Sequence, residues 1–184
     1  MLKYSYYITM TIFFILTVIL QSIAIALGVG SSTLAITNFF VAIADGRISE
    51  DERKMMGIVY IMLRIAMIVI FVTTIIITLI GYSQVGVSIF TPILLAIWTL
   101  ITVLIINAGL MTLHYMPSTV GPALQASSWY TLGVLLALTE LSITPSSYTV
   151  FFLSYLTVIF LAISLVNGIM ALLKRRKEQT TFTE

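Results

Sequence analysis

The chain has 184 residues, of which 60% are hydrophobic and 9% are charged, and its formal net charge is +2. A soluble domain carries about 25% charged residues, so this composition excludes an ordinary water-soluble domain and predicts an integral membrane protein. The small, dispersed positive charge excludes a nucleic-acid surface, and the lack of cysteine excludes disulfides and thiol catalysis.

The first apolar run predicts a membrane helix over residues 4–28, because about 20 apolar residues are enough to cross a bilayer. Gly28 and Gly30, followed by two serines, predict a break after it. A second helix is expected over residues 31–45. This segment is short for a full crossing, so it is either a short span or a re-entrant helix.

The polar loop at residues 45–52 separates this second helix from the third. It imitates the second half of a calcium-binding loop, but Val41 and Ile43 stand where such a loop needs oxygen ligands. Ser49 and Glu52 instead match the S-x-x-E capping box of a helix start. We therefore interpret the loop as a helix-initiating turn and predict no metal site there.

Four further helices are predicted over residues 50–80, 87–115, 119–140 and 147–174, separated by glycine, proline and serine turns. The predicted fold is an all-α integral membrane bundle of six transmembrane helices, forming one domain over residues 1–177 with a flexible cytoplasmic tail at 178–184. Strands are not expected, because a helix satisfies its own backbone hydrogen bonds within lipid.

The basic residues orient these spans, because Lys and Arg gather in cytoplasmic segments. The basic run at 174–177 places the C-terminus inside, and six crossings then bring Lys3, the 46–54 loop and the 114–118 turn to the same side. A five-span topology would leave Lys3 outside. We therefore expect both termini to be cytoplasmic, in a prokaryotic cytoplasmic membrane.

One basic residue, Arg64, lies inside a predicted span, roughly 13 Å beyond Met55 at 1.5 Å per residue. An intramembrane arginine costs about 2.5–3.5 kcal/mol on insertion scales, so it usually has a reason to be there. Arg64 is therefore either a functional site or a structural hydrogen-bond clasp.

Amides from other predicted helices lie near the same depth, roughly 9–11 Å from the cytoplasmic helix ends. They are Asn38, Asn107, Gln125 and Asn167. With Arg64 they would form an intramembrane polar cluster. One interpretation is interhelical hydrogen bonding that holds the bundle together. The other is a polar cavity, open to the cytoplasm, that binds an ion or a small anion.

Two residues are candidates for an interface. His114 is the only histidine, which excludes a haem held by two histidines of one chain, whereas ligation by His114 of two chains or by His and Met stays open. Glu140 ends the fifth predicted helix on the outer side, where it is either solvated or contacts a partner subunit or a cation. We predict no cofactor, no metal site and no catalytic residue, because no nucleophile motif occurs.

Several short segments carry a resemblance. They are His114-Tyr115-Met116-Pro117, Gly121-Pro122-Ala123, Ala126-Ser127-Ser128-Trp129-Tyr130 and Asp45-Gly46-x-Ile48. Together they resemble a family of small uncharacterised polytopic membrane proteins of prokaryotes, over roughly residues 20–135. That resemblance implies no activity. The chain is also superficially similar to four-helix cytochrome b561-like and copper-resistance membrane proteins, but it lacks their paired histidines.

The predicted function is non-catalytic. Short loops and an almost charge-free outer face favour an accessory or scaffold subunit of a larger membrane complex, with partners in the bilayer that are other membrane subunits or copies of itself. The alternative is a small oligomeric transporter or channel whose polar site surrounds Arg64. A cavity facing Arg64 would favour transport or ligand binding, whereas polar side chains sealed against one another would favour the subunit.

Overall fold

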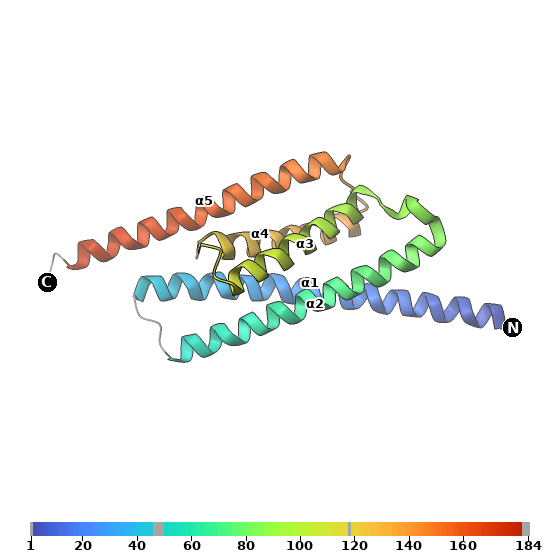
Figure 1. The fold of residues 1–184 in the computed structure, drawn as a ribbon, viewed down its shortest axis with the longest axis horizontal. Coiled ribbons are helices and arrows are strands. Elements are labelled where there is room, and N and C mark those ends of the chain that lie inside the picture. Colours follow the sequence, from blue (N-terminus) through green and yellow to red (C-terminus); the bar gives the residue numbers. More distant parts are fainter. Residues whose placement is uncertain (1, 46–49, 118, 182–184) are drawn as a thin grey trace.

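The computed structural model describes the backbone at residues 2–45, 50–117 and 119–181. Its elements in chain order are α1 Leu2–Asp45, α2 Glu50–Val85, the 3-10 helix η1 Gly86–Ile89, α3 Pro92–Thr112, α4 Val120–Glu140 and α5 Tyr148–Thr181. No strand occurs in the described ranges, in agreement with the predicted all-α bundle (Figure 1).

The predicted break between residues 28 and 31 is wrong, because α1 is one uninterrupted helix of 44 residues. A glycine inside a helix costs only about 1 kcal/mol relative to alanine, whereas a broken helix in lipid leaves backbone groups unsatisfied at several kcal/mol each. Gly28 also has a packing role: a Cβ atom at this position would lie 2.3 Å from the Trp129 ring. The glycine therefore permits a close helix contact and does not end the helix.

The start of α2 agrees with its predicted boundary. Glu50, Asp51 and Glu52 occupy its first turn, where negative charge stabilises the exposed N–H groups of a helix start. Ser49, the other half of the predicted capping box, lies outside the described residues. At the far end, η1 leads into α3, which begins at Pro92 after an N-cap at Thr91.

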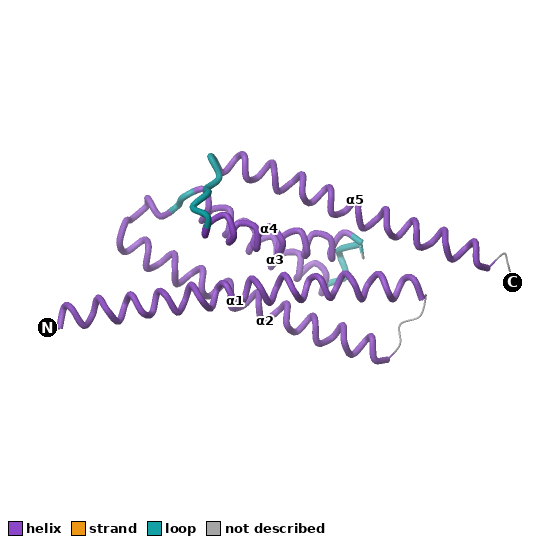
Figure 2. The backbone as a smooth tube through the Cα atoms, turned by 180° about the vertical axis from the view of Figure 1, so that it is seen from behind, coloured by secondary structure: helices purple, strands orange, loops and turns teal. Residues whose placement is uncertain are grey.

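α1 and α2 pack side by side in opposite directions, and α4 lies at the centre, in contact with α1, α3 and α5 (Figures 1 and 2). Trp129 and Leu132 of α4 are fully buried and join a core that includes Ile70 and Leu100. Small residues on α4, such as Ala126, let its neighbours approach closely. At this central position, polar side chains of α4 such as Gln125 and Ser128 are buried.

Within the part of the chain that the structure describes, four helical segments are long and apolar enough to cross a membrane: Thr9–Val41, Glu50–Ile89, Pro92–Thr112 and Tyr148–Leu173. At most a third of the residues in each span are buried in the isolated chain, and many of the exposed ones are large and apolar. A helical chain of this kind has the properties of an integral membrane bundle, as the composition predicts.

The two ends of the chain lie at opposite ends of the long axis (Figure 1). The prediction of six spans with both termini on one side is therefore not supported, because one continuous α1 replaces the two helices expected there. At the other end, α5 continues as a helix to Thr181, through part of the predicted tail. Residues 182–184 of that tail lie outside the described residues.

Candidate functional site

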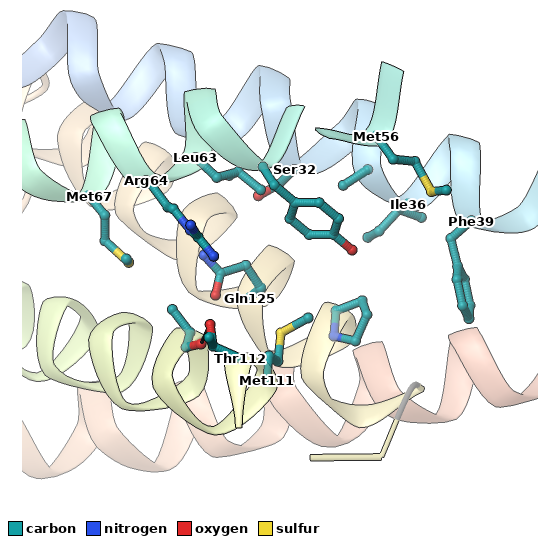
Figure 3. A pocket seen from close by; sticks show the side chains of 14 residues that line it. Ser32, Ile36, Phe39, Met56, Leu63, Arg64, Met67, Met111, Thr112 and Gln125 are labelled. Atoms are coloured by element: carbon teal, nitrogen blue, oxygen red, sulfur yellow. Dashed lines mark hydrogen bonds between the residues drawn. The ribbon is translucent and has the colours of Figure 1, made fainter. Parts of the chain in front are cut away.

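A cavity of about 260 Å³ lies among α1, α2, α3 and α4 and contains the intramembrane arginine (Figure 3). We call it the Arg64 pocket. Its lining comprises Ser32, Ala35, Ile36 and Phe39 of α1, Met56, Tyr60, Leu63, Arg64 and Met67 of α2, Ala108, Met111 and Thr112 of α3, and Pro122 and Gln125 of α4. Arg64 is the one charged side chain among these lining residues.

Arg64 reaches the pocket because of its place on α2. Leu63 and Ala66 face the core, with 5% and 0% of their surface exposed, and each residue turns a helix by about 100°. Arg64 therefore lies on the flank of the helix, where its side chain is exposed and points toward Gln125 (Figure 3). It forms no hydrogen bond or ion pair with any residue in the described ranges.

Gln125 is held by a buried amide from α3. The Nδ2 group of Asn107 donates to Gln125 Oε1 at 3.0 Å and to the Gly121 carbonyl at 2.9 Å, and Asn107 is only 1% exposed. Because its oxygen is already engaged, Gln125 has its Nε2 group left to donate. Arg64 and Gln125 thus bring hydrogen-bond donors to the pocket, which suits a ligand that carries acceptors or negative charge.

Ser32 is a further polar residue of the pocket, besides Tyr60 and Thr112, and the sequence did not predict it as part of a site. It lies in the pocket wall, is 2% exposed, and its Oγ atom has no hydrogen-bond partner. Buried polar groups are normally satisfied, so an unpartnered one at a cavity needs an explanation. The sequence placed Ser32 in a helix break, which concealed its position on the inner face of α1.

The predicted polar cluster is therefore only partly assembled. Arg64, Gln125 and Asn107 come together, whereas Asn167 lies on an exposed face of α5 and Asn38 does not line the pocket. Asn38 is half-buried, and its Nδ2 atom lacks a partner. The depth of each amide in the membrane can be estimated by counting residues along its helix. The direction in which its side chain points depends on how the helices pack, which the count does not give.

His114 occupies a structural position at the end of α3. Its φ angle is 60°, and the following Tyr115 N–H bonds back to the Leu110 carbonyl at 2.9 Å. This is a left-handed helix ending of a kind usually formed by glycine. The His114 and Glu140 side chains are both exposed. The described residues contain no group of three or more His, Cys, Asp or Glu side chains that could hold a metal ion.

A second hollow lies on the outer surface of the same helices, as a groove between α2 and α3. It is lined by Arg64, Met67, Ile68, Ile105, Ala108, Gly109, Thr112 and Leu113. Arg64 therefore belongs to the inner pocket and to the outer groove.

A scan against protein-family models found no match, and searches of curated proteins and of solved structures found no similar protein. What this site does must therefore be argued from its geometry.

Proposed function

We propose that this chain is a non-catalytic membrane protein that binds an anionic group in the Arg64 pocket, and that it acts as a small transporter or membrane-embedded binding protein. One observation carries the proposal: Arg64 faces a cavity and has no partner among the described residues. A structural clasp would require contacts with carbonyl or carboxylate groups, and Arg64 forms none with the residues that the structure describes.

The energetics favour a ligand for this arginine. Placing a guanidinium within a span costs about 2.5–3.5 kcal/mol on insertion scales, and no hydrogen bond from Arg64 to a described residue offsets that cost. A carboxylate can accept two parallel hydrogen bonds from one edge of a guanidinium, and such charge-assisted bonds are roughly twice as strong as neutral ones. The Gln125 amide, fixed by Asn107, lies where it can donate to the same group.

The proposed orientation places the C-terminus in the cytoplasm of a prokaryotic cell. The cytoplasmic side would then hold the end of α1, the start of α2, the turn between α3 and α4 and the basic end of α5, in keeping with the distribution of basic residues. With five crossings, Lys3 would lie on the opposite side of the membrane, as the single basic residue that departs from this distribution. In this orientation the Arg64 pocket lies in the cytoplasmic half of the bilayer.

An accessory or scaffold subunit of a larger complex is the second candidate, and a feature of α5 favours it. Asn167 is exposed on this helix, whose apolar span is only 6% buried. A polar side chain within a membrane helix usually faces protein or a polar cavity. A pull-down in mild detergent with a size measurement tests this candidate: stable foreign partners that are lost in Asn167→Leu would support it.

The proposed binding function is tested with purified protein in lipid nanodiscs. Calorimetric titration would use acetate, decanoate and inorganic phosphate as probes, with wild type, Arg64→Gln and the matched control Arg53→Gln, which removes an exposed arginine near the start of the same helix. We expect at least one anion to bind saturably, and Arg64→Gln to weaken it by about tenfold or more, since hydrogen bonds to charged groups contribute about 1.5–3 kcal/mol.

Arg53→Gln should leave that affinity unchanged. Failure of all three anions to bind wild-type protein, or equal affinity in wild type and Arg64→Gln, would contradict the proposal.

A further inference from the structure

Resting on the proposed anion-binding function, we infer that the ligand is a single-chain amphiphile with one carboxylate, and that it reaches the Arg64 pocket from the bilayer through the gap between α2 and α3. Four features of the structure support this inference: the apolar pocket wall, the size of the pocket, the arrangement of the two hollows and the space around Gly109.

The wall of the pocket beyond its few polar groups is apolar. Leu63, Met67 and Met111 line it together with Ile36 and Phe39. Methionine side chains are flexible and polarisable, so they adapt to apolar ligands of varied shape. A small hydrated ion would leave most of this wall without a partner, whereas an alkyl chain would cover it.

The size of the pocket limits the chain that it can hold. Its volume of about 260 Å³ lies just below the roughly 300–1,000 Å³ of typical drug-sized sites. This space suits one medium-length alkyl chain and is too small for a two-chain phospholipid. The polar end is recognised by Arg64 and Gln125, and the buried, unpartnered Ser32 hydroxyl offers a further hydrogen bond.

The pocket and the outer groove share four residues: Arg64, Met67, Ala108 and Thr112. The rest of the groove is apolar and faces outward, with Ile68 63% exposed and Leu113 64% exposed. In a membrane this surface would meet the acyl chains. The shared residues therefore stand between the lipid and the cavity, with Arg64 positioned to draw in an anionic head group.

Gly109 keeps this gap wide. A Cβ atom added at Gly109 would meet no other atom within 4 Å, so open space lies beside α3 at the groove. Gly30 on α1 is also surrounded by open space and exposed, but it lines neither hollow. A larger residue at Gly109 should therefore block the route, and the same substitution at Gly30 is the matched control.

The head group and chain are tested by comparing probes in nanodiscs. We expect decanoate to bind wild-type protein about tenfold or more tighter than acetate, because each further CH₂ group that the apolar wall buries strengthens binding. Decanol, which keeps the chain and lacks the charge, should bind as weakly as decanoate binds to Arg64→Gln. Arg64-dependent binding of acetate or phosphate with no gain for decanoate would overturn this inference and leave the proposed anion site intact.

The route is tested by stopped-flow transfer of decanoate from lipid vesicles to the protein. Gly109→Leu should slow the association of decanoate on the order of tenfold, since blocking an access route lowers the association rate. The affinity of Gly109→Leu for acetate should stay at the wild-type value, and so should the association rate of Gly30→Leu with decanoate. Gly109→Ala should give a smaller effect in the same direction, which guards against a folding defect of the leucine variant. An unchanged association rate in both Gly109 variants would overturn the route between α2 and α3.

Discussion

Arg64 and Asn107 have opposite roles although both are polar side chains within membrane helices. Asn107 is almost fully buried and uses both of its N–H groups on neighbouring oxygens. Arg64 is exposed at a cavity and uses none of its donors on a described residue. The first arrangement holds α3 and α4 together, and the second leaves charge available for a ligand.

Substitution of Asn107 by leucine should affect stability and binding together. It removes two hydrogen bonds to oxygen atoms of α4 and a weaker one to Met111 Sδ within α3. Bonds between membrane helices contribute about 0.6 kcal/mol on average and up to about 1.7 kcal/mol each, so we expect the free energy of unfolding to fall by about 1–3 kcal/mol. Freed of its partner, Gln125 should also turn away and weaken anion binding. Thermal unfolding in detergent and calorimetric titration measure the two effects.

Asn167→Leu is the matched control, because Asn167 is exposed on α5 and lies outside the pocket. It should leave anion affinity unchanged. If Asn107→Leu and Asn167→Leu had equal effects on affinity, the support of Gln125 by Asn107 would be ruled out.

Among the helices, α1 and α4 make the closest glycine-mediated contact that the structure describes, where Gly28 meets Trp129. The indole is fully buried, so neither partner has room to move. This contact positions α4, and α4 carries Gln125 into the pocket.

Gly28→Ala should therefore be destabilising although alanine favours helices. The added methyl group overlaps the Trp129 ring, and overpacking of this kind costs about 1–3 kcal/mol. Gly30→Ala has open space and should be neutral or stabilising, by up to about 1 kcal/mol. Thermal unfolding of both variants checks this, and equal stabilities would show that the Gly28 contact is not tight.

The number of helices was harder to predict from the sequence than their nature. Apolar runs identify membrane helices, and Pro92 and Pro117 mark real boundaries of α3 and of the turn that follows it. In the sequence, Gly28 and Gly30 both resemble helix breakers. In the structure, Gly28 packs against Trp129, whereas Gly30 lies within α1 with open space beside it. That distinction depends on Trp129, a residue a hundred positions away, and no local pattern reveals it.

The site shows the same limit. Arg64 could be identified because a charge in an apolar run is conspicuous, and Asn107 and Gln125 because their depth matches that of Arg64. Ser32 could not, because its importance depends on α1 passing beside α2 without a break. Asn167 has the matching depth but the wrong direction, since Val166 is the buried neighbour on α5.

For the molecule as a whole, the five crossings that we propose would place the two ends of the chain on opposite sides of the membrane. α1 has 44 residues and is about 66 Å long at 1.5 Å per residue, roughly twice the 30 Å hydrocarbon thickness of a bilayer. One crossing by α1 therefore leaves a long helical extension outside the hydrocarbon core. The remaining helices pass back and forth beside it (Figure 2).

This topology can be tested directly, because the natural chain has no cysteine. Single cysteines introduced at Ser142 and Thr180 should differ in reaction with a membrane-impermeant maleimide in intact cells. We expect Ser142→Cys, in the turn after α4, to be labelled and Thr180→Cys to be labelled only after the membrane is opened. Labelling of both in intact cells, or of neither, would contradict the proposed orientation.

The most direct test of the central claim is to locate a bound anion with a photoreactive probe. A decanoate analogue carrying a diazirine on its chain would be irradiated with the protein in nanodiscs, and the adducts mapped by mass spectrometry. Binding at the Arg64 pocket requires adducts concentrated on lining residues such as Met67 and Met111, lost in Arg64→Gln and retained in Arg53→Gln. Adducts spread over the lipid-facing surface of α5, unchanged by Arg64→Gln, would show that Arg64 does not form an anion site.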